Sequence, residues 1–323
     1  MTSLGPVVCV GAGRMGRGIA VAHVLADVPV TLLDIKERDA DGAAALAESV
    51  RSDVRGDLER LVSLGALAPE RLERCADLVD VAGPGDAARV LAPAGLVHEA
   101  VPETEEAKRL AFALIGEHVA DDAPVGSTTS AMLVTELAGL VAHPGRFLNT
   151  HWLNPAFVVP LVELSVHPGT DPQVVDAVRA HLELIGKVPV VCGPTPGYIV
   201  PRLQALIMNE AARLVEEGVA TPEQIDTATR YGLGFRFASM GVLEFVDYGG
   251  NDTLHHAGSY LAEHVDEHRY AVPDIVERYR EGRNGLRDGQ GFHDYPDAER
   301  EAYQSDVLAR LLHAQDLLHP RRS

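Results

Sequence analysis

The stretch VVCVGAGRMGRGIA at residues 7–20 decides the fold of this chain. It opens with a short apolar run of strand length and passes through three closely spaced glycines into a helix-like pattern over residues 15–25. A second apolar run follows at residues 28–33. The order of these patterns predicts a strand, a helix and a second strand, with the glycines in the turn between the first two elements.

The three glycines suit a turn that binds a pyrophosphate group. Gly11 allows the tight turn after the strand, Gly13 lets the backbone approach the phosphates, and Gly16 lets the helix pack closely on the strand. The start of the helix then faces the anion with its unpaired amide groups. Glycine triplets also occur in plain strand-to-helix turns, but the place of this one between a strand and a helix favours a dinucleotide site. The loop residues expected at the cofactor are Gly11, Gly13, Arg14, Met15 and Gly16.

An acidic residue at the end of the second strand indicates which dinucleotide to expect. Asp34 follows that strand and can accept hydrogen bonds from a ribose 2′-hydroxyl, whereas it would repel a 2′-phosphate. The sequence therefore favours NAD over NADP. Lys36 and Arg38 follow closely and leave NADP open as an alternative at this point.

The alternation of apolar runs and helical patterns continues to about residue 192. Strands that are apolar on both faces are typical of a mostly parallel sheet covered by helices, so we expect an α/β fold for this part of the chain. Between residues 43 and 67, apolar residues recur every three or four positions, which predicts an amphipathic helix. Further strands are expected at residues 78–81, 96–97, 124–126, 147–150, 161–166 and 188–192.

The alternation ends at the segment GPTPG, residues 193–197, because its prolines and glycines continue neither a helix nor a strand. We therefore expect two domains, residues 1–193 and residues 194–323. The second domain shows mainly helical patterns. One of its helices is expected to begin with a threonine cap at Thr221 and a proline in the first turn at Pro222.

The charge balance of the chain excludes several kinds of partner. The 323 residues include 28 Lys+Arg and 47 Asp+Glu, which gives a formal net charge of −19. Such acidity repels a nucleic-acid backbone and an anionic membrane surface, so we expect neither as a partner. The longest apolar runs have the length of strands, which also argues against a membrane-spanning helix.

The start of the chain and its cysteines point to a reducing, cytoplasmic setting. Residues 1–6 lack the basic segment and the apolar stretch of a secretion signal. Cys9, Cys75 and Cys192 are too few and too scattered for a disulfide framework or a zinc site. We therefore expect no metal.

Four polar residues fall on or beside three consecutive predicted strand ends, namely Ser130, His151, Asn154 and Glu163. A neutral imidazole titrates near neutrality and suits the removal of a hydroxyl proton, and a carboxylate can hold that imidazole in one tautomer. Plainer interpretations exist. His151 fits a surface or core histidine, Ser130 a helix cap and Glu163 a surface carboxylate, while Asn154 fits a turn. Spacing alone leaves these alternatives open.

Several spaced motifs resemble the L-3-hydroxyacyl-CoA dehydrogenase family along nearly the whole chain. They are the glycine loop at residues 11–20, STTS at 127–130, HWLNP at 151–155, LVE at 161–163, PGYIV at 196–200 and GQGF at 289–292. Agreement among several motifs is far more specific than a glycine loop alone.

This resemblance implies a Rossmann-type domain that binds NAD, joined to a helical domain through which the protein forms a homodimer. It also implies that His151 is the catalytic base, that Glu163 is its partner and that Ser130 binds the reacting oxygen. In such enzymes the Glu-Ala-x-x-Glu stretch, here residues 99–103, places its second acid beside the cofactor. Glu103 is therefore a further candidate contact.

One position departs from the usual pattern of the family at the expected substrate site. Pro201 stands where an asparagine usually reaches the substrate, and since a proline side chain forms no hydrogen bond, that contact is absent or moved. Proline is tolerated near the start of a helix. Gln204, three residues later on the same helical face, is a candidate replacement, and Asn154 is another candidate substrate contact.

A second departure concerns the substrate. The segments GLGFRFA at 232–238, RLQ at 202–204 and PLVEL at 160–164 are similar to the branch of the family that acts on free hydroxy acids, such as gulonate dehydrogenase and its lambda-crystallin relatives. Members of the acyl-CoA branch are usually apolar at the position of Arg236. A guanidinium offers a two-pronged contact to a carboxylate, which a thioester lacks, whereas a surface or subunit ion pair is the plainer interpretation of Arg236.

The sequence thus predicts an NAD-dependent dehydrogenase that reversibly oxidises the C3 hydroxyl of a small 3-hydroxy acid to the 3-oxo product. A short-chain (S)-3-hydroxyacyl-CoA, such as 3-hydroxybutyryl-CoA, is the alternative substrate. A crystallin-like structural protein that retains NAD binding is the alternative of another class. The intact set of His151, Glu163 and Ser130 argues against a purely structural role.

Overall fold

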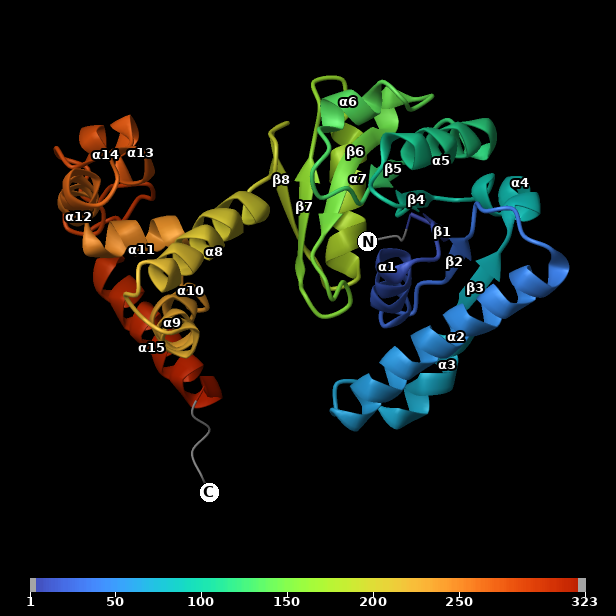
Figure 1. The fold of residues 1–323 in the computed structure, drawn as a ribbon, viewed down its shortest axis with the longest axis horizontal. Coiled ribbons are helices and arrows are strands. Elements are labelled where there is room, and N and C mark those ends of the chain that lie inside the picture. The colour runs from blue at the N-terminus through green and yellow to red at the C-terminus, as the bar shows by residue number, and fades with distance from the viewer. Residues whose placement is uncertain (1–3, 319–323) are drawn as a thin grey trace. The chain divides into compact units, whose positions relative to one another are not determined.

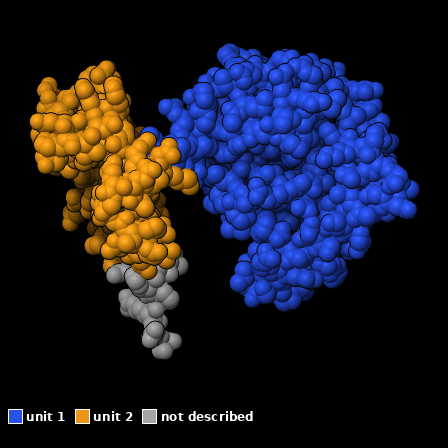
Figure 2. All heavy atoms as spheres, viewed as in Figure 1, with its two compact units in different colours: residues 1–207 blue, residues 208–323 orange. Residues whose placement is uncertain are grey.

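The computed structural model describes residues 4–318, and the chain forms two compact units, Met1–Ile207 and Met208–Ser323 (Figures 1 and 2). The first unit is built on a mostly parallel sheet and the second is mainly helical, which confirms the predicted fold class. The domain boundary after residue 193 stays a prediction. The first residues of helix α8, which begins at Val200, belong to the first unit by their packing.

The sheet of the first unit has eight strands in the order β3-β2-β1-β4-β5-β6-β7-β8. All neighbouring strands are parallel except β6 and β7, which are antiparallel. The strand order reverses beside β1, and open sheets of this kind bind ligands where such a reversal occurs, at the carboxyl ends of the strands. The strands are β1 (Val7–Val10), β2 (Val30–Leu33), β3 (Val79–Ala82), β4 (Leu96–Glu99), β5 (Val125–Ser127), β6 (Phe147–Trp152), β7 (Leu161–Ser165) and β8 (Val188–Cys192).

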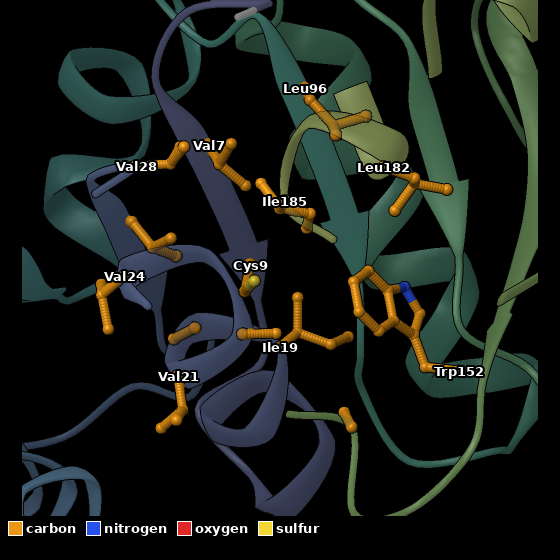
Figure 3. Packing of buried hydrophobic residues seen from close by; sticks show 14 of the residues in the cluster. Val7, Cys9, Ile19, Val21, Val24, Val28, Leu96, Trp152, Leu182 and Ile185 are labelled. Atoms are coloured by element: carbon orange, nitrogen blue, oxygen red, sulfur yellow. The ribbon is translucent and has the colours of Figure 1, made fainter. Parts of the chain in front are cut away.

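Helices cover both faces of this sheet because its central strands are apolar on both sides. In β1, Val7 and Cys9 lie in one hydrophobic core, whereas Val8 and Val10 lie in the other. The first core includes the single tryptophan, Trp152, together with Cys9 and Ile19 (Figure 3). The helices of this unit are α1 (Arg14–Val24), α2 (Ala40–Ser63), α3 (Leu72–Asp77), α4 (Ala87–Leu91), α5 (Glu105–His118), α6 (Val134–Ala138) and α7 (Pro172–Leu184), with short 3₁₀ helices η1 (Pro69–Arg71), η2 (Pro84–Asp86) and η3 (Pro144–Arg146).

The second unit is a set of helices, as its patterns predict. The predicted cap is present: Thr221 accepts a hydrogen bond from the backbone N–H of Gln224, and Gln224 accepts one from Thr221. Within residues 4–318, no helix is both long enough and apolar enough to cross a bilayer. The elements from α8 onward are α8 (Val200–Glu216), α9 (Pro222–Ala228), the π-helix η4 (Thr229–Gly234), α10 (Phe235–Phe237), α11 (Val242–Gly249), α12 (Asn251–His264), α13 (Glu267–Tyr270), α14 (Asp274–Tyr279) and α15 (Arg300–Leu318).

Candidate active site

The glycine loop between β1 and α1 is tightly packed at two positions and open at the third. Gly11 has a φ of +112°, and a Cβ atom there would lie 2.6 Å from the backbone oxygen of Ala100. A Cβ atom at Gly16 would lie 2.0 Å from the backbone oxygen of Gly11. At Gly13 a Cβ atom would meet nothing within 4 Å. The loop therefore fits a pyrophosphate group that approaches at Gly13.

The start of α1 adds an anion site to this loop. The helix begins at Arg14, its first turn contains no acidic residue, and no side chain caps its first amide groups. These amides and the positive end of the helix dipole are available to phosphate oxygens. The residues predicted to contact the cofactor, Gly11 to Gly16, thus combine the open approach and the donors that a dinucleotide needs.

Asp34 lies directly after β2 and is 9% exposed. Its Oδ2 atom accepts a hydrogen bond of 2.7 Å from Nε of Arg38, one turn further along the chain. Arg38 is one of the two basic residues that left NADP open, and here its charge is paired with the carboxylate. The second carboxylate oxygen keeps its lone pairs for a ribose hydroxyl, which supports NAD as the cofactor.

A buried histidine and a buried glutamate form the centre of the candidate active site. His151 Nδ1 lies 2.7 Å from Glu163 Oε2, and the two side chains are 8% and 0% exposed. Since a carboxylate only accepts hydrogen bonds, Nδ1 carries the proton and Nε2 is left as the basic nitrogen. Glu163 Oε1 accepts two more bonds, from the backbone N–H groups of Ile199 and Val200 at 2.9 Å each. These contacts fix the orientation of the carboxylate and, through it, of the imidazole.

The pairing of β6 with β7 brings these two residues together. His151 and Glu163 are direct cross-strand partners in the antiparallel register. Glu163 lies in the middle of β7, not at a strand end, so its contact with His151 comes from this pairing of neighbouring strands. Adjacent antiparallel residues on one face of a sheet have side chains close enough to interact directly, which explains the short contact.

Ser130 lies on a loop after β5 whose conformation is organised by Glu103. The Glu103 carboxylate accepts hydrogen bonds from the hydroxyls of Thr129 and Ser130 and from the backbone N–H groups of Ser130 and Ala131. Burial alone would raise the pKa of Glu103, but these hydrogen bonds outweigh it and lower the pKa to about 2. The predicted cofactor contact Glu103 is therefore a permanent anion that anchors the Ser130 loop.

A second buried carboxylate lies at the ends of β4 and β5, where the sequence did not single out a site. Glu99 Oε2 accepts bonds from Lys108 Nζ at 2.7 Å and from Ser127 Oγ at 2.6 Å, and Oε1 accepts one from the backbone of Val101. The side chains of Lys108 and Glu99 are 1% and 0% exposed. The sequence signal available for it was weak: a lysine nine residues after a glutamate. The network joins α5 to the two strands that lead into the site.

Tyr198 is the other residue of the site that the sequence did not single out. Its ring is stacked on the His151 imidazole, with ring centroids 4.8 Å apart and planes inclined by 10°. Its hydroxyl donates to the backbone oxygen of Thr129 at 2.8 Å and accepts from Asn149 Nδ2 at 3.0 Å. The motif PGYIV at residues 196–200 was the signal that could have identified it. Gly197 and Tyr198 in this motif both have positive φ angles, which regular helices and strands do not adopt.

The predicted substrate contacts are all exposed. Asn154 follows β6 in a turn with a cis bond to Pro155, and Gln204 lies on α8. Pro201 is the second residue of α8, in the first turn where proline is tolerated. Arg236 belongs to the second unit, in α10, where its guanidinium lies 5.1 Å from the centre of the Phe245 ring. Their roles toward a substrate stay predictions.

A Rossmann-type sheet with an open glycine loop and an aspartate after its second strand defines an NAD-dependent dehydrogenase. Comparison with known proteins specifies the family. The model of the 3-hydroxyacyl-CoA dehydrogenase NAD binding domain matches residues 6–195, and the model of the C-terminal domain of the same enzymes matches residues 197–295. The chain belongs to the 3-hydroxyacyl-CoA dehydrogenase family and is an NAD-dependent oxidoreductase that acts on CH–OH groups.

Relatives with different names resemble the chain along most of its length. The 5-formyl-3-hydroxy-2-methylpyridine 4-carboxylate 5-dehydrogenase of Mesorhizobium japonicum is 28% identical over 316 residues, 98% of each chain. Rabbit (Oryctolagus cuniculus) lambda-crystallin is 34% identical over 264 residues, 79% of this chain and 78% of the relative. The 3-hydroxybutyryl-CoA dehydrogenase of Mycobacterium tuberculosis is 34% identical over 293 residues, 88% of this chain and 96% of the relative.

Solved structures agree with this assignment. The crystal structure of a 3-hydroxyacyl-CoA dehydrogenase from Archaeoglobus fulgidus has a TM-score of 0.74 and 28% identity, covering 96% of this chain and 99% of that one. The crystal structure of the pyridine carboxylate dehydrogenase has a TM-score of 0.69 and 27% identity, covering 98% and 99%.

Proposed function

We propose that the protein oxidises the C3 hydroxyl of a small free 3-hydroxy acid to the 3-oxo acid, with His151 as the general base. The observation that carries this proposal is the buried pair of His151 and Glu163, with a 2.7 Å contact between Nδ1 and Oε2. Neutral imidazole with one nitrogen held by a carboxylate is the arrangement that accepts a proton from a hydroxyl group most readily near neutral pH.

The residues of the site divide the reaction between them. Nε2 of His151 takes the hydroxyl proton, and the Glu163 carboxylate stabilises the imidazolium that results. Ser130 contacts the reacting oxygen, with its hydroxyl oriented by Glu103. Bound NAD would supply the acceptor for the hydride that leaves C3. The residues expected to hold it are the loop from Gly11 to Gly16 and Asp34.

Arg236 supports a free acid as the substrate. Its side chain is exposed and lies over the Phe245 ring, and within residues 4–318 its guanidinium forms no ion pair, so its hydrogen-bond donors are available to a carboxylate. The Mesorhizobium relative, which matches the chain over nearly its full length, has a carboxylate in the name of its substrate.

A CoA thioester is the second candidate substrate. A hollow of about 320 Å³ beside α1 and α2 is lined by Arg14, Arg17 and Arg60, and guanidinium groups are suited to bind phosphates such as those of CoA. Two carboxylates face the same hollow, Asp53 and Asp57, and Asp53 forms an ion pair with Arg17. This compensation weakens the attraction for a ligand with several phosphates.

A paired substrate screen tests this choice. NADH formation is measured with free 3-hydroxy acids and with the CoA thioesters of the same acyl groups, in the wild type and in Arg236→Met. We expect faster turnover of the free acids and a loss of about 30-fold in kcat/KM, about 2 kcal/mol, in the variant. Arg230→Met, an exposed arginine of the same unit, is the matched control. Turnover of thioesters that is the same in the wild type and in Arg236→Met, or turnover of thioesters alone, would favour the second candidate.

We also propose that the protein is a cytoplasmic homodimer that uses α8. No residue of this 17-residue helix is buried, and Leu206 and Met208 are 69% and 63% exposed. A second copy of the chain would remove such an apolar face from water. All three cysteines are free, which supports a reducing compartment. Sedimentation velocity is expected to show a dimer, and Leu206→Glu is expected to shift it toward monomer.

A further inference from the structure

Tyr198 adopts a backbone conformation that few residues other than glycine accept. It lies between β8 and α8 with a φ of +46°, directly after Gly197 at +72°, and it is only 3% exposed. A left-handed conformation costs a residue with a Cβ atom about 1–2 kcal/mol. The contacts around Tyr198 must therefore offset this cost. Strained backbone positions of this kind cluster at functional sites.

The Tyr198 ring lies flat against the imidazole of the proposed base. The planes of Tyr198 and His151 are inclined by 10° with centroids 4.8 Å apart. The next two residues, Ile199 and Val200, donate their backbone N–H groups to Glu163. The short segment 198–200 therefore fixes the plane of the imidazole and the orientation of the carboxylate that bonds its Nδ1 atom.

The Tyr198 hydroxyl reaches the loop that carries Ser130. It donates to the backbone oxygen of Thr129, the residue before Ser130, and accepts from Asn149. Asn149 lies on β6, two residues before His151, and also donates to the backbone oxygen of Met132 at 3.1 Å. Burial raises the pKa of Tyr198, so its hydroxyl remains protonated and keeps donating. The hydroxyl thus links the Thr129 side of the Ser130 loop to Asn149 on the strand of the base, and Asn149 itself bonds the Met132 side.

We propose that Tyr198 is a positioning residue that holds His151 and Ser130 at a fixed separation, using its ring for the base and its hydroxyl for the loop. This inference rests on the proposed function, in which those two residues act on the same hydroxyl group. The two parts of the side chain act on different partners, so they can be tested separately. A displacement of reacting groups by about 1 Å can cost about 100-fold in rate.

Two substitutions separate the hydroxyl from the ring. Tyr198→Phe keeps the ring and removes the tie to Thr129, and we expect a loss of about 5-fold in kcat. Tyr198→Leu removes both, and we expect a loss of about 50-fold in kcat. In both variants KM for NAD should stay within about twofold, because the cofactor loop is not altered. A residue that only fills space would lower thermal stability and leave kcat near that of the wild type.

A matched control is present in the second unit. Tyr260 stacks on His264 with centroids 4.1 Å apart and planes inclined by 16°, so Tyr260→Leu removes a tyrosine–histidine stack of similar geometry from a helix surface. We expect its kcat to remain within about twofold of the wild type. Thermal unfolding and near-UV circular dichroism are recorded for every variant. Should Tyr198→Leu fail to fold, Tyr198→Phe tests the hydroxyl by itself.

Double-mutant cycles decide whether Tyr198 acts through its two partners. In a Ser130→Ala background, Tyr198→Phe should cost no more than about twofold, and in a His151→Ala background Tyr198→Leu should likewise add little. The inference is overturned if the losses in kcat from the Tyr198 substitution and from the background substitution multiply in full in both backgrounds. It is also overturned if the single Tyr198 variants have the kcat of the wild type. His151→Ala with wild-type turnover would overturn the proposed function instead. If His151→Ala has a low kcat while the Tyr198 variants keep the kcat of the wild type, the positioning role of Tyr198 fails and the proposed function stands.

Discussion

The first unit buries histidines in two different surroundings, and the difference shows what makes a histidine useful for catalysis. His151 is paired with Glu163 at the edge of the core. His23, His98 and His181 lie within the core on α1, β4 and α7. Among these three, His23 Nε2 contacts His181 Nε2 at 3.2 Å, and neither ring nitrogen of His98 has a hydrogen-bond partner within the described residues.

The surroundings of the core histidines disfavour the charged form of the ring. Burial lowers the pKa of His23 to about 3 and of His181 to about 4, and it lowers the pKa of His98 well below its ordinary value. The rings of His23 and His98 contact the Trp152 ring, and His181 contacts His23. Trp152 belongs to the first hydrophobic core, whose apolar packing Figure 3 shows from close by. Burial alone therefore keeps a histidine neutral and inert, whereas a carboxylate on one nitrogen prepares the other to take up a proton.

Replacing the paired histidine should have the largest effect on turnover. His151→Ala removes the proposed base, and we expect kcat to fall by about 1,000-fold, within the range typical of general base catalysis. The affinity for NAD, measured by fluorescence titration, should remain nearly unchanged. The matched control is His98→Leu, which removes an unpaired core histidine and should leave turnover close to that of the wild type. A small effect of His151→Ala would assign the proton transfer to another residue.

Removing only the charge of the partner tests the pairing itself. In Glu163→Gln the side-chain amide can donate to Nδ1 of His151, which favours the tautomer whose Nε2 carries the proton and cannot act as a base. We expect kcat to fall by about 100-fold with little change in thermal stability. Glu183→Gln, at an exposed glutamate of α7, is the control for a change of charge. Unchanged kcat in Glu163→Gln would mean that the carboxylate does not select the tautomer.

The sequence predicted the features that depend on local patterns. The glycine loop, the strands and the helix cap at Thr221 follow from spacing over a few residues, and the structure confirms them. Strands that are apolar on both faces look alike whether they pair in parallel or antiparallel. The antiparallel pairing of β7 with β6 could therefore not be predicted from the sequence, although this pairing makes His151 and Glu163 cross-strand partners.

Contacts between distant residues set the limit of prediction. Tyr198 meets Thr129 across 69 residues of sequence, and Ser127 meets Glu99 across 28, so neither contact follows from any local periodicity. The burial of the core histidines could not be predicted either, because a helical or strand pattern does not show whether a histidine within it is buried or exposed. A resemblance to a family assigns roles to motif residues, but it does not say which neighbours hold those residues in place.

The core histidines should make the protein sensitive to acid, an effect smaller than the losses of turnover. Below pH 6.5 the unfolded chain binds protons on these residues, while native His23 and His181 stay neutral until about pH 3 to 4 and burial also lowers the pKa of His98 well below its ordinary value. The unfolded state then holds more protons, so the free energy of unfolding falls as the pH falls, by up to about 1.4 kcal/mol per pH unit for each histidine. Urea unfolding followed by the fluorescence of Trp152 between pH 7.5 and 5 measures this slope.

His98→Leu sharpens the same measurement. Replacing an unpaired buried polar ring by an apolar side chain of similar size should leave stability at pH 7.5 unchanged or slightly higher, within about 1 kcal/mol. Below pH 6.5 the variant should lose stability less steeply than the wild type, by about one proton, because one neutral ring has been removed from the core. If the free energy of unfolding of the variant depends on pH as steeply as that of the wild type, other groups take up the protons. The variant therefore tests whether burial without a hydrogen-bond partner is the property that distinguishes a core histidine from His151.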